Sequence, residues 1–200
     1  MSRVKILMAA AVTAVTAVSV TASPASAWPA GDLTATLEED LSFTWALGTD
    51  TCTSSALEGS ITSGGAITID TAVFGGCTGT ISSIEALPVS SPSARTAWPN
   101  LFWSWNLTPT SGYNYDGLLS VTGFRVAIRL NVLGGITCVY TSPFSGYYYH
   151  GTNPKRPLSY YPYLQFRFPG VPVPKAASGS HWFCPNTVTT TGVWVVPGIV

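Results

Sequence analysis

The clearest periodic pattern in the chain runs from Gly123 to Tyr140, where apolar and polar positions alternate. Two sets of side chains fall on opposite faces of an extended chain: Phe124, Val126, Ile128, Leu130 and Val132 against Arg125, Ala127, Arg129 and Asn131. A period of two is typical of a half-buried strand. Gly134 and Gly135 can supply the positive φ of a tight turn, after which the alternation resumes over residues 136–140. The pattern predicts a β-hairpin whose apolar face lies at the centre of a sheet.

Similar alternation recurs in short segments elsewhere, separated by Gly, Pro, Ser and Thr. The pattern predicts strands over residues 33–37, 41–47, 51–55, 57–61, 66–74, 80–87, 101–107, 118–121, 164–168 and 193–196. Between the first two, Glu38, Glu39 and Asp40 are expected to form a solvated turn. About nine to eleven strands at this spacing are typical of two architectures. We therefore expect an all-β fold, either an antiparallel β-sandwich of the immunoglobulin-like kind or a β-barrel.

Two segments interrupt this pattern. The stretch from Pro88 to Pro99 is rich in Pro and Ser, and we expect it to be a loop that crosses between two sheets. Six Tyr residues broken by Pro crowd between residues 143 and 163, which predicts a long aromatic loop with Lys155 and Arg156 at its tip. Further along, the segment from His181 to Cys184 is expected to re-enter the core.

The first residues have the three parts of a secretory signal peptide. A basic start and an apolar run lead to the small residues Ala25-Ser26-Ala27. The apolar run is shorter than the roughly 20 residues of a spanning helix, which argues against a membrane anchor. We expect cleavage before Trp28. Residues 1–27 are then a signal peptide and residues 28–200 a single secreted, extracellular β domain with no membrane attachment.

Charge divides the chain into two halves. Without the basic residues of the signal peptide, the chain holds seven basic and nine acidic residues, a balance of minus two. Eight of the acids, from Asp32 to Glu85, precede Arg95, and only Asp116 is acidic after that point. The two halves either face each other or spread their charge over a solvated surface. The more specific interpretation of this charge division is that the basic half carries a binding site for a polyanion.

Four cysteines in an exported chain predict two disulfides. Three pairings are possible. Cys52–Cys77 with Cys138–Cys184 is favoured, because this sequential pairing closes short loops inside each half. The competing interpretation is metal ligation, but the chain has no CxxC spacing and only two histidines that could assist, so we expect no metal site.

Three cysteine-containing segments resemble a group of small exported actinobacterial proteins of unassigned function. The segments are CTSSALEGSITSGGAITIDTAVFGGCTG from Cys52, CVYTSPFSG from Cys138 and CPNTVTTTGVWVV from Cys184. The resemblance covers about half of the chain after the signal peptide and rests on Cys, Gly and Thr spacing. It implies an extracellular β-sandwich-like domain and the sequential disulfide pairing, and it supplies no catalytic residues. The tyrosine-rich insert between Cys138 and Cys184 departs from the simpler pattern of the group.

Catalytic chemistry is hard to place in this sequence. There is no GxSxG elbow, phosphate-binding loop or dinucleotide motif. His150 and His181 are the only imidazole bases, and each is expected to pack or hydrogen-bond locally. Most acids lie early and most aromatic rings late, which disfavours a glycosidase. The alternative to a binding protein is an extracellular hydrolase on a β scaffold, which requires a His beside a Ser or an acid in a cleft. We expect no catalytic residue and no cofactor.

Binding is better supported, because Tyr rings offer flat apolar faces with polar edges that suit sugars or protein surfaces. The candidate binding surface consists of Tyr147, Tyr148, Tyr149, Lys155, Arg156, Tyr160, Tyr161 and Tyr163. The alternative is that most of these rings pack as core, or as a lid over an open end of the domain. The expected function is that of a secreted non-enzymatic β domain that binds a cell-envelope polysaccharide or protein, with no nucleic-acid partner.

Overall fold

The computed structural model describes residues 28–46, 48–89, 101, 103–110 and 114–199. Eleven strands and no helix lie in these residues, and every strand pairing is antiparallel. The strands are β1 Gly31–Trp45, β2 Gly48–Ile61, β3 Ala66–Cys77, β4 Ile81–Ala86, β5 Trp103–Pro109, β6 Gly117–Thr122, β7 Arg125–Leu130, β8 Ile136–Thr141, β9 Phe144–Tyr149, β10 Leu164–Pro174 and β11 Thr187–Val196. The predicted signal peptide lies outside the described residues.

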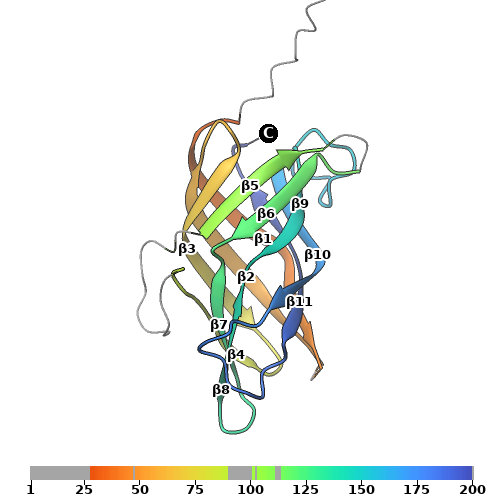
Figure 1. Cartoon of the computed structure of the whole chain (residues 1–200). Helices are drawn as coiled ribbons and strands as arrows, with labels where there is room; N and C mark the ends of the chain where they lie inside the picture. Colours follow the sequence, from red (N-terminus) through yellow and green to blue (C-terminus); the bar gives the residue numbers. More distant parts are fainter. Residues whose placement is uncertain (1–27, 47, 90–100, 102, 111–113, 200) are drawn as a thin grey trace, which may run out of the picture.

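Eight of the strands form a closed barrel, in the order β1-β11-β10-β9-β6-β5-β3-β2 (Figure 1). The last strand closes the barrel against the first, with Thr36 opposite Val195. Inward and outward positions alternate as the sequence predicts: along β5 Trp103 and Trp105 are buried, whereas Ser104 is exposed. The all-β expectation is therefore confirmed, and the barrel is the form that the fold takes.

Aromatic rings fill the barrel interior. Trp105 meets Phe166 and Phe168 edge to face, with ring centroids 5.8 and 6.1 Å apart. Such edge-to-face pairs are favourable beyond the area that they bury. The rings press so closely on neighbouring strands that a Cβ added to Gly146 would lie 2.8 Å from Cδ1 of Phe168. Because Gly146 has no side chain, there is room beside it for the Phe168 ring.

The three remaining strands form a small sheet in the order β4-β7-β8, which lies at the lower end of the barrel in Figure 1. The predicted hairpin is confirmed as β7 and β8, and β7 is the central strand. Val126 and Ile128 face the barrel, where they line an internal cavity together with barrel residues. The face of the small sheet that points away from the barrel is covered at its middle. There, Ala127 is fully buried under Leu87 and Ala176.

The chain passes from this sheet to the barrel through the proline-rich segment predicted to connect two sheets. Pro88 follows β4 of the small sheet, and the next strand, β5, belongs to the barrel. Residues 90–99 of the segment lie outside the described residues. Side chains from both sheets belong to one hydrophobic core.

The expectation of two early strands separated by a turn is wrong. Residues 31–45 form one long strand, β1, that pairs with β2 on one side and β11 on the other. Register shifts occur between Leu37 and Ser42 on the β11 side and between Thr36 and Leu41 on the β2 side. The acidic triplet Glu38–Asp40 is therefore a β-bulge, in which extra residues are accommodated without a reversal of the chain.

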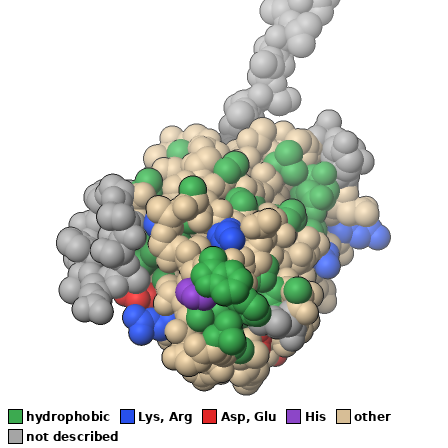
Figure 2. Space-filling view, turned by 60° about the horizontal axis from the view of Figure 1, so that its bottom comes forward, with side chains coloured by type: hydrophobic (Ala, Val, Ile, Leu, Met, Phe, Trp, Pro, Cys, Tyr) green, Lys and Arg blue, Asp and Glu red, His purple; other side chains and the backbone are tan. Residues whose placement is uncertain are grey.

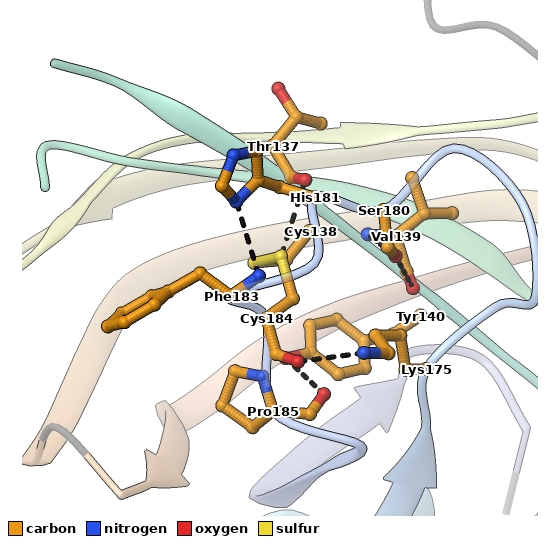
Figure 3. The surroundings of a disulfide bond; sticks show 10 residues. All are labelled: Thr137, Cys138, Val139, Tyr140, Lys175, Ser180, His181, Phe183, Cys184 and Pro185. Carbon is orange, nitrogen blue, oxygen red and sulfur yellow. Dashed lines mark hydrogen bonds between the residues drawn. A yellow bond between two sulfur atoms is a disulfide. The ribbon is translucent and has the colours of Figure 1, made fainter. Parts of the chain in front are cut away.

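Both predicted disulfides are present. Cys52 and Cys77 lie directly opposite each other on β2 and β3. Cys138 of β8 is bonded to Cys184, in the loop between β10 and β11, and so ties the small sheet to the barrel (Figure 3). The hairpin is held to the segment beyond the tyrosine-rich stretch, as the sequence predicts.

The expectation that residues 181–184 re-enter the core holds only for the last of them. Cys184 is 3 % exposed, whereas Trp182 is 81 % and Phe183 39 % exposed. Cys184 N–H donates to the carbonyl of His181 in a tight turn. Because the turn directs Cys184 inward to its disulfide, the residues before it project outward.

We expect the disulfide that links the two sheets to contribute more stability than the one within the barrel. Replacing Cys138 and Cys184 by Ala should lower the free energy of unfolding by about 4 kcal/mol, and replacing Cys52 and Cys77 by about 3.5 kcal/mol, because the first pair closes a longer loop. Urea denaturation of the two variants and the parent measures both losses. A larger loss for the Cys52–Cys77 variant would contradict this ranking.

Candidate functional site

The tyrosine-rich loop, defined as residues 150–163 between β9 and β10, is fixed to the barrel at its first turn by Asp116. The carboxylate of Asp116 accepts hydrogen bonds from the backbone N–H of His150, at 2.7 Å, and from Nδ2 of Asn153, at 2.9 Å. Asp116 lies just before β6, the strand next to β9. The last acid of the sequence therefore anchors the loop and is not free for chemistry.

Gln165 anchors the other side of the loop from within β10. Its side chain is fully buried although it lies on the outward face of the strand, because the loop folds over it. Its Oε1 accepts from the N–H of Leu158 at 3.0 Å, and its Nε2 donates to the carbonyls of Leu158 and Tyr161 at 2.8 and 3.1 Å. A buried amide with three bonds is well satisfied. Gln165 thus holds the loop against the outer wall of the barrel.

Arg156, a candidate binding residue, is an internal brace of the loop. Its guanidinium donates to the carbonyls of Asn153 at 2.9 Å, Tyr161 at 3.0 Å and Ser159. Lys155, by contrast, has an exposed side chain. Of the two basic residues predicted at the tip, Lys155 is the one that faces solvent.

The six candidate tyrosines are divided between core, wall and surface. Tyr148 and Tyr149 are 0 % and 4 % exposed, and Tyr147 is half-buried and stacks on Tyr115, with ring centroids 4.1 Å apart. Burial and the charge of Asp116 raise the pKa of Tyr148 to about 12. The prediction that all six tyrosines lie in one long loop is therefore wrong for these three, which belong to strand β9 and are largely occupied by contacts within the fold.

The other three candidate tyrosines come together on the outside of the barrel. Tyr161 and Tyr163 pack with Leu158 over two valines of β11, Val193 and Val195. Tyr160, at 69 % exposure, lies beside Tyr161 with ring centroids 4.5 Å apart. The loop therefore covers the outer wall, and the ring of Tyr160 is left open to solvent.

The acidic bulge of β1 meets this aromatic group. The hydroxyl of Tyr161 donates to Oε2 of Glu38 at 2.5 Å. This hydrogen bond and the carboxylate charge raise the pKa of Tyr161 from 10.0 to about 12. We define the Tyr160 surface as Tyr160, Tyr161 and Glu38. Glu38 is not among the binding residues predicted from the sequence, because three adjacent carboxylates are typical of a solvated turn.

The two histidines lie in settings that do not favour hydrolysis. The ring of His150 stacks on Trp28, with centroids 4.8 Å apart and planes 5° apart. Nδ1 of His181 accepts from the backbone N–H of Phe183. Within the described residues, no hydrogen bond joins either imidazole to a Ser hydroxyl or a carboxylate, and no three metal-ligating side chains cluster.

The interior of the barrel contains a cavity of about 40 Å³ between the small sheet and the barrel wall. Its lining is almost wholly apolar and includes Phe43, Trp103 and Ile128. Ligand pockets for small organic molecules have volumes of about 300 Å³ or more. The cavity is therefore a packing void, and the candidate binding surfaces lie on the outside.

Comparison with known proteins does not identify the chain: no protein-family model, curated protein or solved structure matches it. In the part of the chain that the structure describes, no helix is long and apolar enough to span a membrane.

The contact between Tyr161 and Glu38 can be tested through the Tyr161 pKa. Replacing Glu38 by Gln removes the negative charge that disfavours tyrosinate, so the pKa of Tyr161 should fall from about 12 toward 10. An NMR titration of ring-labelled tyrosine measures the shift, and Glu39→Gln is the matched control that should leave the pKa unchanged. An unaltered pKa in the Glu38 variant would show that the contact is not formed in solution.

Proposed function

We propose that the chain is an exported, non-enzymatic β-barrel domain that binds a cell-envelope glycan through the Tyr160 surface. Export is supported by the signal-peptide pattern over residues 1–27 and agrees with the two disulfides. Binding is supported by one observation above all: Tyr160 is 69 % exposed on a loop whose backbone is held by hydrogen bonds. The loop is ordered in advance, so binding does not need to fix it.

The chemistry of this surface suits a sugar. The Tyr160 ring provides a flat apolar face, and the hydroxyl and carboxylate of the Tyr161–Glu38 pair lie at its side. A pyranose ring presents C–H groups on its faces and hydroxyls at its edge. The C–H face stacks on the aromatic ring while the hydroxyls hydrogen-bond to oxygen acceptors such as the Glu38 carboxylate.

Tyr160→Ala should reduce retention of the domain on cell-wall polysaccharide about tenfold, which corresponds to ~1.4 kcal/mol of binding free energy. The ring is exposed, so its removal should leave the unfolding midpoint unchanged. Tyr160→Phe is the matched control, because it keeps the ring and removes only the hydroxyl. Affinity electrophoresis in gels that contain the polysaccharide measures the retention.

A second variant separates the ring from the scaffold that holds it. Gln165→Leu leaves the N–H of Leu158 and the carbonyl of Tyr161 without their side-chain partner, and should free the loop while Tyr160 is retained. Retention should then fall as in Tyr160→Ala. Parent-level retention by both variants would place the binding site elsewhere on the domain.

A further inference from the structure

A second exposed apolar group lies at the end of the barrel that carries the small sheet, away from the tyrosine-rich loop. We define the aromatic tip as Leu133, His181, Trp182 and Phe183. Leu133 lies in the β7–β8 turn and is 65 % exposed, and Trp182 is 81 % exposed. In Figure 1 that turn and the loop between β10 and β11 are at the lower end of the molecule. Figure 2 brings this end forward and displays a group of hydrophobic side chains with a histidine at its edge.

The backbone that carries the aromatic tip is firmly held. The N–H of His181 donates to the carbonyl of Thr137 at 2.9 Å, and the hydroxyl of Ser180 exchanges hydrogen bonds with both backbone groups of Val139, at 2.8 and 2.9 Å. The Cys138–Cys184 disulfide closes the other side of the turn (Figure 3). Trp182 therefore projects from a fixed platform, and its exposure is a property of the fold.

The rings of the aromatic tip contact each other. Trp182 meets His181 and Phe183, with ring centroids 5.5 and 5.6 Å apart. The Phe183 ring stands at 89° to that of Trp182. An indole ring kept in water forgoes the favourable burial of its large apolar surface. An exposed apolar group on a rigid support is typical of a contact site.

The charged groups behind the aromatic tip are mainly basic, and Glu85 of β4, which lies opposite Ala127 of β7, is the acid of the small sheet. The sequence contains no Asp or Glu after Asp116, so β7, β8 and the loop that follows β10 carry only basic groups. Arg129 is exposed on β7, Arg125 donates to the carbonyl of Ser178, and Nζ of Lys175 donates to the carbonyl of Cys184 at 2.9 Å. The partners of Arg125 and Lys175 are neutral carbonyls, so these contacts do not cancel the charge of the two side chains.

We propose that the aromatic tip is a membrane-contact site that takes an anionic phospholipid surface. Trp182, Phe183 and Leu133 enter the headgroup region of the bilayer, while the basic side chains behind them face its phosphates. An indole ring is favoured at the boundary between water and lipid. Basic residues near an anionic bilayer are attracted to its surface. This inference differs from the sequence-based expectation of no membrane partner, and it does not depend on the Tyr160 surface.

The combination of groups favours a lipid surface over other partners. Leu133 and Phe183 lack polar atoms in their side chains, so they offer no acceptor to sugar hydroxyls, whereas they suit the acyl boundary. A second copy of the chain would bring like charges together across the same face. The expected contact is shallow and weak, because few side chains take part.

The test is partitioning of the chain from Trp28 onward onto phospholipid vesicles. The protein should sediment with vesicles that contain phosphatidylglycerol and much less with phosphatidylcholine alone, and salt should weaken the interaction. Trp182 is the exposed indole among the described residues, since the other five are at most 7 % exposed. With Trp98, which lies outside those residues, replaced by Phe, a shift of the emission to shorter wavelength reports insertion of Trp182.

Two variants test whether the aromatic tip and the basic residues behind it take part in membrane contact. Trp182→Ala with Phe183→Ala should reduce partitioning at least tenfold, and Arg129→Glu should reduce it only on phosphatidylglycerol vesicles. Tyr160→Ala, at the other end of the barrel, is the control that should partition as the parent does. The changed side chains are exposed, and an unchanged thermal midpoint confirms that the fold is kept.

Several outcomes would overturn the proposal. One is absence of the parent protein from the vesicle pellet, and another is equal partitioning of the Trp182 and Phe183 double variant. Equal partitioning onto both lipid compositions would show that the basic residues do not contribute to membrane contact. Binding of a soluble anionic polysaccharide through the same residues, without vesicle binding, would assign the aromatic tip to a glycan. A dimer that is lost in the double variant would assign it to a second copy.

Discussion

The pairing of the first strand with the last is the constraint on which the other features of this fold depend. Because β1 lies between β2 and β11, none of the eight barrel strands presents a free edge. To pair on both sides along its length, β1 must follow the curvature of the wall, and it does so through the bulge at Glu38–Asp40. That bulge brings Glu38 to Tyr161. The geometry of the Tyr160 surface is therefore a consequence of barrel closure.

Features set by local pattern could be predicted from the sequence. The alternation and paired glycines of the β7–β8 hairpin are local, and each disulfide closes a loop within one half of the chain. The choice between sandwich and barrel could not be made, because both bury one face of each strand and so give the same alternation. The bulge could not be predicted from the sequence, because an acidic triplet between two apolar runs has the composition of a turn.

The candidate site was harder to predict, because composition locates the tyrosines but not their direction. Tyr148 and Tyr149 occupy neighbouring positions on opposite faces of β9, yet both are buried. The reason is a second layer: the loop covers the outer wall. One signal was present in the sequence, since β11 ends in the continuous apolar run Val193–Val196, which indicates burial on both faces. No comparable signal marked Trp182, whose outward direction follows from the disulfide beside it.

The position of β1 beside β11 also bears on how the chain acquires its structure as it is synthesised. Residues 31–77 contain the β1–β2–β3 meander and both cysteines of the first disulfide, so this unit has its pairing partners early. The edge of β1 that pairs with β11 stays unpaired until β11 is synthesised. β11 begins at Thr187, near the end of the chain. Contacts between such distant segments form slowly, because loop closure costs entropy before pairing compensates it. During that interval the long unpaired edge of β1 is open to pairing with another chain, and the charged bulge at its middle, Glu38–Asp40, interrupts that edge and opposes such pairing.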